Sequence, residues 1–357
     1  MIYKTNEIQL SDFPRTCGEW LQARGDENDV VISSRVRLAR NIQGFNFPSR
    51  MTDPQKQDVV ELVAEAIRGR AMRLDLDQSN SIDRALLVER HLISKELASG
   101  EGARSVVFGR GEMISVMVNE EDHLRIQCIK SGFDLDRAWQ RLSRIDRVLE
   151  KQMPISFDDR YGYLTACPTN VGTGMRVSVM LHLPALTMKD HIRKVQRACD
   201  NMNNALRGLY GEGTQSLGDF YQISNQATLG KSEEEIVADL KSVIPVVIKY
   251  ERGMREALLT EERAHLEDRV GRALATLRVA RQMNVEEMMQ HMSMVRLGMG
   301  LGLISNDEVD IDMINELFLL CQPAHLQKRE RRSLTPEERD VLRAEIIRTR
   351  LSSASMN

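Results

Sequence analysis

Hydrophobic and polar residues alternate along several short stretches between residues 29 and 230, which is the pattern of strands that bury one face. Residues 29–40 place valines, an isoleucine and a leucine on one face, and Ser33, Arg35 and Arg37 on the other. Further strands are predicted within residues 84–94, 103–108, 116–128, 164–184 and 221–230. Because the 116–128 stretch has the pattern of two strands joined by a turn, we predict that the sheet is antiparallel.

Apolar stripes with helical spacing predict helices over residues 52–70, 135–149 and 188–206 and after Ser232, which forms a capping-box pattern with Glu235. From about residue 255 no strand pattern remains. Helices are predicted there from Thr260, over 284–297, over 307–321 and after Thr335, which forms a second capping-box pattern with Glu338, with residues 322–334 as a connection. We therefore predict an α+β fold, with an antiparallel sheet flanked by helices over residues 1–254 and an all-helical domain over residues 255–357.

The composition is that of an ordinary globular protein. The chain has 357 residues, of which 28% are charged and 42% hydrophobic, and its net charge of −3 argues against a nucleic-acid binder. The N-terminus lacks the apolar core of a signal peptide, and no run approaches the ~18 apolar residues of a membrane span. The five cysteines are scattered and lack CxxC spacing, so we expect a reducing cytoplasm, without disulfides or a zinc cluster.

The 116–128 stretch also concentrates chemistry. If the chain is extended from residue 121 onward, Glu121, His123 and Arg125 point to one face, above an apolar backing. A carboxylate, an imidazole and a guanidinium side by side indicate a site, and a solvated hairpin tip with a local ion pair explains them equally well. Arg35 and Arg37 form a fork for polyanionic oxygens, although an edge strand kept soluble by its charges has the same pattern.

Two glycine-rich stretches follow. Residues 167–174, CPTNVGTG, are not a P-loop, because no GK[ST] is present and a strand follows. Cys167 stands at the mouth of this loop, where a thiol of lowered pKa is expected to assist catalysis rather than form a covalent intermediate. The loop after residue 208 carries one acid, Glu212, and loops of this composition often close over a ligand. A lone loop glutamate is also commonly just solvated.

Five arginines arise from strands or glycine-bounded turns, namely Arg35, Arg37, Arg125, Arg176 and Arg207. Buried like charges require a multiply charged anion among them, and a nucleoside triphosphate with Mg²⁺ meets that requirement. Glu121 and Glu212 would then face the acceptor. Two carboxylates suit a guanidinium acceptor, because they can hold its planar fork and remove a proton from it, whereas a hydroxyl acceptor needs only one base.

The blocks SSRVRLARN, NEEDHLRI, CPTNVGTG and the Arg207–Glu212 turn resemble, in this order, the signature blocks of the ATP:guanido phosphotransferases, the family of creatine and arginine kinases. The resemblance covers roughly residues 30–250 and implies a phosphagen-kinase-like catalytic domain that uses ATP and Mg²⁺, with no metal ligand from a protein side chain. It implies that the five arginines clamp phosphates, that Glu121 and Glu212 are the catalytic carboxylates, and that Cys167 lies beside the guanidine. The implied nucleotide-binding set also includes Ser33, Ser34, Val36, His91, Val177, Ser178, Val179, Met180, Gly208, Leu209, Tyr210 and Gly211.

Two departures from the metabolic members narrow the resemblance. Only 32 residues precede Ser33, too few for the helical N-terminal domain that encloses a small guanidine, and a C-terminal helical domain with RDVLRA at 339–344 is present instead. Both features resemble bacterial protein-arginine kinases. That resemblance implies protein substrates bearing arginine, Clp-type proteolysis of the product, a role in stress response, a zinc-binding activator protein and a homodimer or higher oligomer.

The same resemblance implies an allosteric phosphoarginine pocket formed by Arg339, Asp340, Arg343 and Ala344. Two arginines near a helix N-terminus suit a phosphate, although a surface salt-bridge cluster is the usual explanation of this pattern. Two other functions remain open. One is a kinase for free arginine or a related small guanidine, and the other is a phosphoarginine-binding adaptor with a vestigial kinase site. The presence of both glutamates and all five arginines weighs against the adaptor.

Overall fold

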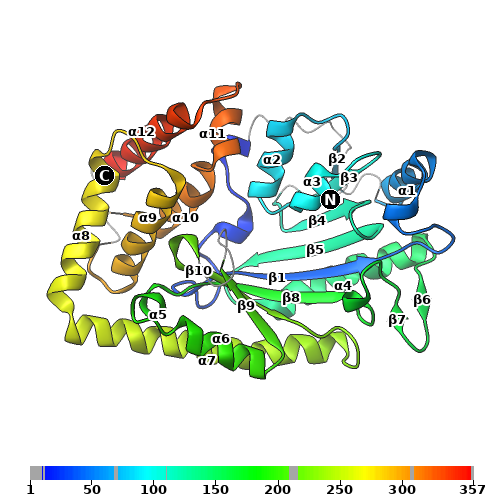
Figure 1. Ribbon diagram of the computed structural model, residues 1–357, viewed down its shortest axis with the longest axis horizontal. Coiled ribbons are helices and arrows are strands. Elements are labelled where there is room, and N and C mark those ends of the chain that lie inside the picture. The colour runs from blue at the N-terminus through cyan, green and yellow to red at the C-terminus, as the bar shows by residue number, and fades with distance from the viewer. Residues whose placement is uncertain are drawn as a thin grey trace.

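The structure is a computed structural model that describes residues 10, 13–67, 71–109, 111–208, 216–305 and 309–354 (Figure 1). Its centre is an eight-stranded sheet in the order β2-β3-β4-β5-β1-β8-β10-β9, and every neighbouring pair is antiparallel. The strands are β1 (Val31–Arg40), β2 (Met72–Asp75), β3 (Ser105–Phe108), β4 (Ile114–Val118), β5 (Leu124–Ser131), β8 (Met175–His182), β9 (Asn204–Gly208) and β10 (Phe220–Asn225). A separate pair is formed by β6 (Phe157–Asp158) and β7 (Gly162–Tyr163).

The helices divide into two groups along the chain. Those that alternate with the strands are α1 (Asp53–Ala66), α2 (Ser81–Glu89), α3 (Lys95–Ser99), α4 (Leu135–Gln152), α5 (Pro184–Met188), α6 (Ile192–Asn201) and α7 (Glu233–Glu261). The C-terminal group comprises α8 (Arg263–Val279), α9 (Val285–Gly300), α10 (Ile311–Leu320), α11 (Pro323–Glu330) and α12 (Pro336–Ala354). In Figure 1 this second group, coloured yellow to red, gathers at one end of the sheet.

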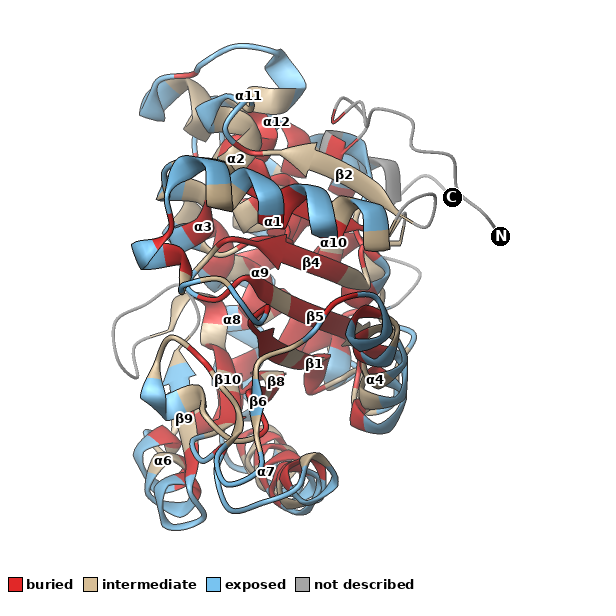
Figure 2. Cartoon of the chain, turned by 90° about the vertical axis from the view of Figure 1, so that its right-hand side faces the viewer, coloured by how far each residue is buried: buried red, intermediate tan, exposed pale blue. Residues whose placement is uncertain are grey.

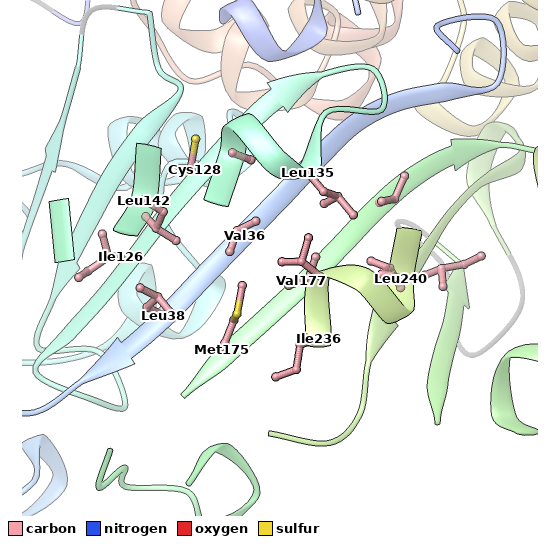
Figure 3. Close-up of a cluster of buried hydrophobic side chains, with 14 of the residues drawn as sticks. Val36, Leu38, Ile126, Cys128, Leu135, Leu142, Met175, Val177, Ile236 and Leu240 are labelled. Atoms are coloured by element: carbon pink, nitrogen blue, oxygen red, sulfur yellow. The ribbon is translucent and has the colours of Figure 1, made fainter. Parts of the chain in front are cut away.

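One face of the sheet is buried under α4 and α7. Alternate strand residues such as Val36, Ile126 and Val177 meet Leu142 of α4 and Leu240 of α7 (Figure 3). Because each fully buried aliphatic side chain contributes about 1.5–3 kcal/mol, this layer is the main source of the sheet's stability. Figure 2 shows the central strands largely buried, whereas α1, α4 and α6 turn one side to solvent. The opposite face of the sheet is thereby free to carry polar side chains.

A second hydrophobic cluster joins the C-terminal helices to the sheet. Its members from α8–α12 pack with Trp20, Ile32, Ile129 and Phe220, which come from the N-terminal segment and the strands. Ile32 belongs to this cluster rather than to the layer under α4 because the register of β1 shifts between Val31 and Ser33. Helix α7 runs without a break through residue 254, so the boundary proposed there falls inside a helix.

The α+β architecture with an antiparallel sheet and a helical C-terminal region is confirmed, but three elements differ from the prediction. Residues 84–94 are not a strand, because Ser81–Glu89 form α2, which is capped by Asn80. A short buried apolar run cannot be assigned to strand or helix by periodicity alone. The helix predicted over 188–206 ends at Asn201 and is followed by β9. Residues 322–334, predicted as a connection, contain α11.

Candidate active site

Five arginine side chains lie on one face of the sheet, opposite the α4–α7 layer. The register pairs Arg37 with Arg176 across β1 and β8, and it pairs Ala39 with Arg125 across β1 and β5. Arg35 and Arg37 share this face because they are two residues apart on β1. Arg207 of β9 lies on the same face. It pairs with Gln222 of β10, and Gln222 pairs with Met180 of β8. Met180 shares the face of Ser178, the partner of Arg35, because the two are two residues apart on β8. Strands far apart in the sequence thus bring the predicted phosphate-binding residues together.

These arginines perturb one another. Burial, followed by the neighbouring Arg125 and Arg176, lowers the pKa of Arg35 to about 10. Burial and the charges of Arg35, Arg176 and Arg125 lower the pKa of Arg37 well below its ordinary value. The pKa of Arg176 is also lowered, by burial and then by Arg207 and Arg125. A group of cations that destabilise each other's charged forms is suited to receive a polyanion.

Two of the guanidinium groups have donors without an acceptor. The Nε atoms of Arg37 and Arg176 are buried, and neither has a hydrogen-bond partner in the part of the chain that the structure describes. A buried donor left unpaired costs about 1–3 kcal/mol, so a ligand that accepts from these two atoms would recover that free energy on binding. Arg176 retains one protein contact, a hydrogen bond of 3.1 Å from Nη2 to Ser224 Oγ. These donors fit the oxygen atoms of a triphosphate.

Two other arginines of this face, Arg35 and Arg125, are held by polar side chains that the sequence did not single out. Arg35 donates from Nε to Gln127 Oε1 at 2.9 Å. Arg125 forms an ion pair with Glu120, whose side chain is 1% exposed, and its Nη2 lies 3.8 Å from Glu121 Oε2. Glu120 stands beside Glu121 in the run NEED, so adjacency was the available signal. The pairing of Gln127 with Arg35 depends on cross-strand register, which the sequence does not reveal.

Glu121 lies in the β4–β5 hairpin tip with its side chain 45% exposed. Burial, followed by the adjacent Asp122, raises the pKa of its carboxyl group above the ordinary 4.5. Asp122 itself is fully buried, and its Oδ1 accepts hydrogen bonds of 2.7 Å from Asn41 Nδ2 and from the backbone N–H of Ala166. The hairpin tip is therefore tied to the residue before Cys167, and the accessible carboxylate of raised pKa suits a general base.

His123 does not take part in this arrangement, and the prediction that it lies beside Glu121 and Arg125 is wrong. Strand β5 begins only at Leu124, and the imidazole of His123 is fully buried. Its Nδ1 accepts from the backbone N–H of Ile42 at 2.9 Å, and Nε2 donates to Asn46 O at 2.8 Å. Burial lowers the pKa of His123, which agrees with a neutral ring. The residue anchors the loop after β1.

Cys167 begins a short 3₁₀ turn and is half-buried, with its Sγ 3.0 Å from Thr169 Oγ1. Thr228 holds the loop through its single hydroxyl hydrogen, since Oγ1 lies within donating distance of both Thr169 O at 2.9 Å and Val171 O at 2.8 Å. Gly172 has φ +110°, and a Cβ there would lie 2.3 Å from Thr228 O. The glycine thus permits close packing of the loop on residue 228.

The other predicted nucleotide-binding residues divide by the face they occupy. Ser33, Ser178 and Met180 pair within the arginine-bearing face. Val36, Val177 and Val179 point into the layer under α4 and α7, so only their backbone atoms are available to a ligand. Ser34 is also turned away, since its Oγ donates to Gly132 O and accepts from Asp134 N. Gly208 ends β9. Leu209, Tyr210, Gly211 and Glu212 lie outside the described residues.

His91 follows α2 in the left-handed conformation, with φ +57°. Its ring makes an edge contact with Trp20 at 5.2 Å and lines a cavity together with Met180, Phe220 and Phe318, between the sheet and the C-terminal helices. Burial, followed by the charges of Arg35 and Arg37, lowers the pKa of His91 to about 3. The structure thus places a neutral imidazole next to the arginine face.

The RDVLRA segment lies on α12, away from the sheet. Arg343 is buried and donates from Nε to Cys321 O at 2.9 Å and from Nη1 to Met283 O at 2.7 Å and Asp340 Oδ1 at 2.6 Å. Ala344 is buried as well. Arg339 is partly exposed, and its guanidinium forms no hydrogen bond or ion pair within the described ranges. Arg343 therefore joins three segments of the helical region, whereas Arg339 stands at the surface of α12 near Glu337.

The part of the chain that the structure describes contains neither a membrane-spanning helix nor a metal-binding cluster. None of the helices that the structure describes is long and apolar enough to cross a membrane. Within the same residues, no group of three or more histidine, cysteine, aspartate or glutamate side chains could hold a metal ion.

Comparison with known families gives two matches that together span most of the chain. Residues 55–254 match the ATP:guanido phosphotransferase, C-terminal catalytic domain, and residues 263–357 match the protein-arginine kinase McsB C-terminal domain. The protein-arginine kinase of Halothermothrix orenii is 43% identical over 342 residues, which cover 95% of this chain and 97% of that protein. The protein-arginine kinase of Caldanaerobacter subterraneus is 46% identical over 333 residues, covering 91% and 98% respectively.

Solved structures agree with these matches. A lombricine kinase has a TM-score of 0.58 and 25% identity, covering 71% of this chain and 73% of its own. The duplicated taurocyamine kinase from Schistosoma mansoni, with bound transition state analog components, has a TM-score of 0.59 and 22% identity. It covers 78% of this chain and 42% of its own, and this similarity concerns the fold alone.

Proposed function

The chain belongs to the ATP:guanido phosphotransferase family and is a guanido phosphotransferase, and we propose that its acceptor is the arginine side chain of proteins. The observation that carries phosphoryl transfer from ATP is the single sheet face on which five arginines converge, with Nε donors of Arg37 and Arg176 that have no partner among the described residues. The near full-length similarity to proteins named protein-arginine kinase supports proteins as the substrates.

ATP is proposed to bind with its triphosphate on the arginine face. Arg35, Arg37 and Arg176 lie on the central strands β1 and β8, with Arg125 on one side and Arg207 on the other. Such fixed cations neutralise the charge of the transferring phosphoryl group without reorganising during the reaction. Mg²⁺, when bound with ATP, would supply further neutralisation of the phosphate charge, and we propose that no side chain of this chain coordinates it directly.

The acceptor guanidine is proposed to lie between the hairpin tip and the Cys167 loop. A guanidine nitrogen forms a bond to the γ-phosphorus, the bond from that phosphorus to the β–γ bridging oxygen breaks, and ADP leaves. The proton released from the nitrogen passes to the carboxylate of Glu121, whose raised pKa makes it a competent base. Glu212 is proposed as the second carboxylate and Cys167 as a group that helps to orient the guanidine.

Phosphoarginine on other proteins is proposed as a ligand of the RDVLRA segment, with Arg339 as the available cation and Asp340 held in place by Arg343. From the resemblance to bacterial protein-arginine kinases we also propose that the phosphorylated proteins enter Clp-type proteolysis during stress. A zinc-binding activator, an oligomeric state of two or more, and a cytoplasmic location belong to the same proposal.

Transfer of labelled phosphate from ATP tests the acceptor directly. Casein and free arginine are offered separately, and phosphoarginine is detected by mass spectrometry under non-acidic conditions, because the P–N bond is acid-labile. Labelled casein with unlabelled free arginine supports the proposal. Transfer to free arginine alone would make the protein a small-guanidine kinase, and binding of phosphoarginine without any transfer would make it an adaptor. Glu212→Ala is expected to abolish transfer. If the two carboxylates act as a unit, the loss of transition-state stabilisation should be ~3 kcal/mol or more.

A further inference from the structure

A partly buried carboxylate, that of Glu89, joins helix α11 of the C-terminal group to the end of α2, and Figure 1 shows the two helices side by side. Glu89 accepts hydrogen bonds from the backbone N–H groups of Ala324 at 2.8 Å and His325 at 3.1 Å, which are in the first turn of α11. The same carboxylate accepts from His325 Nδ1 at 2.7 Å. The N-terminal N–H groups of a helix lack partners within the helix, so Glu89 of α2 caps α11. We call this interface between α2 and α11 the seam.

The imidazole of His325 has one protonation state in this seam. Its Nδ1 donates to Glu89, while Nε2 accepts from Arg90 Nη1 at 3.2 Å. Burial lowers the pKa of His325 despite the opposing effect of Glu89, so the ring is neutral. Arg90 is itself buried, and it pairs with Glu112 and donates to Phe13 O at 2.9 Å. The end of α2 is therefore held by His325 of α11 together with Phe13 and Glu112.

The residue that follows Arg90 is His91, in the left-handed conformation. A non-glycine residue there costs about 1 kcal/mol or more, and it persists only where surrounding contacts impose it. Its backbone N–H donates to Val88 O at 2.9 Å, which fixes the turn at the end of α2. Its carbonyl oxygen accepts from Gln127 Nε2 at 2.6 Å. The direction of this carbonyl thus depends on how α2 ends.

Gln127 passes this constraint to the arginine face. The amide is buried, and its Nε2 also donates to Ser115 Oγ at 2.6 Å, while Ser115 Oγ donates to Leu92 O at 3.1 Å. Its Oε1 accepts from Arg35 Nε at 2.9 Å. With both amide ends committed, the side chain has a single orientation. Arg35 has like charges as neighbours, so this amide oxygen is what holds its guanidinium among them.

We propose that Gln127, Glu89 and His325 are positioning residues of the phosphate-binding face. Through these three side chains the C-terminal helices set the orientation of Arg35. None of the three touches the reacting atoms. The inference rests on the proposed function, because it assumes that Arg35 binds the triphosphate of ATP. Release of α11 from Glu89 frees the turn at His91, the Gln127 amide loses its fixed acceptor, and the Arg35 guanidinium moves away from its cationic neighbours.

The test compares full-length variants by the KM for ATP, by kcat and by thermal unfolding. Gln127→Leu is expected to raise the KM for ATP at least about tenfold, because a hydrogen bond to a charged group is lost. His325→Leu is expected to raise it in the same direction. His325→Asn retains a donor near Nδ1 and is expected to raise it less. The double variant Gln127→Leu/His325→Leu is expected to be no worse than Gln127→Leu alone, because both changes act through Arg35.

Several outcomes overturn the proposal. An unchanged KM for ATP in folded Gln127→Leu would show that Gln127 does not position Arg35. If the two substitutions raise the KM for ATP additively in the double variant, Gln127 does not act through the seam. A lower melting temperature without a change in KM makes the Glu89–His325 contact purely structural. If His325→Leu does not fold, Glu89→Gln replaces it in the same comparison. Arg35→Ala separates the two proposals, since wild-type use of ATP in that variant overturns the proposed role of Arg35 as well.

Discussion

The carboxylate of Asp122 accepts a hydrogen bond from the backbone N–H of Ala166 at 2.7 Å, which joins the tip of the β4–β5 hairpin to the loop that carries Cys167. The same oxygen accepts from Asn41 Nδ2, so three segments of the chain meet at one buried atom. Glu121 precedes this residue and faces solvent, whereas Asp122 faces inward. Adjacent acids therefore have separate tasks: one anchors the backbone, and the other is left free for chemistry.

Removal of the anchor is expected to reduce both stability and activity. Asp122→Ala leaves the backbone N–H of Ala166 unpaired, and Asn41 Nδ2 keeps only its hydrogen bond to Leu164 O, so we expect the free energy of unfolding to fall by about 1–3 kcal/mol. The hairpin tip then moves relative to the Cys167 loop, and kcat should fall about tenfold or more. Asp122→Asn keeps one oxygen acceptor and is the matched control, with smaller losses. Urea denaturation and steady-state kinetics measure the two effects, and a full kcat in Asp122→Ala would contradict the positioning role.

Glu121→Gln is expected to reduce kcat by about 100-fold or more, the usual contribution of a general base, with little change in stability because the side chain is half-exposed. The pKa of Glu121 is raised, so the carboxylate is protonated, and activity lost, as the pH falls through a value above the ordinary 4.5. The acid limb of the kcat/KM profile should disappear in Glu121→Gln. Glu101→Gln, which changes an exposed carboxylate elsewhere, is the control and should keep that limb.

The arginine face could be anticipated because the period of two along β1 and β8 assigns Arg35, Arg37 and Arg176 to faces before any register is known. The alternation of polar and apolar residues did not locate His123 correctly. Strand β5 begins at Leu124, so His123 lies just outside the strand and its ring turns into the core. The partners Gln127 and Glu120 were missed for a related reason. Their roles come from cross-strand pairing and turn geometry rather than from their own segments.

The helical elements show the same limit. The apolar run in residues 84–94 satisfies both a buried strand and a short helix, and the Asn80 cap was the signal that could have decided between them. The capping boxes at Ser232 and at Thr335 were predicted correctly, because such boxes depend on residues only three positions apart. Local chemistry was therefore predictable, whereas the α2–α11 seam, with partners more than 230 residues apart, was not.

The two arginines of the RDVLRA segment should respond differently to substitution. Arg343→Ala removes buried hydrogen bonds to Cys321 O and Met283 O, so we expect the free energy of unfolding to fall by about 2–4 kcal/mol. Arg339→Ala should stay within about 0.5 kcal/mol of the wild type, because its side chain is partly exposed. Phosphoarginine binding, measured by calorimetry, should weaken in Arg339→Ala. An unchanged affinity there would leave the segment with a structural role only.

The cationic face should cost the protein stability in the absence of ATP. Arg37 is surrounded by like charges, which together with burial lower its pKa, and its Nε lacks an acceptor among the described residues. Arg37→Met removes the charge and keeps the unbranched chain, so we expect the free energy of unfolding to rise by about 0.5–2 kcal/mol while phosphoryl transfer is lost. Arg144→Met, at an exposed position of α4, is the control and should change neither.

Ligand binding should reverse this order of stability. A molecule that binds only the folded state raises the melting temperature with its concentration, so saturating ATP or inorganic tripolyphosphate should stabilise the wild type and not Arg37→Met. The melting temperatures of both proteins, each with and without tripolyphosphate, therefore give a complete test. A variant that is less stable than the wild type without ligand would show that Arg37 already has a compensating partner. In that case the requirement for a polyanion at this face would no longer follow from the buried charge.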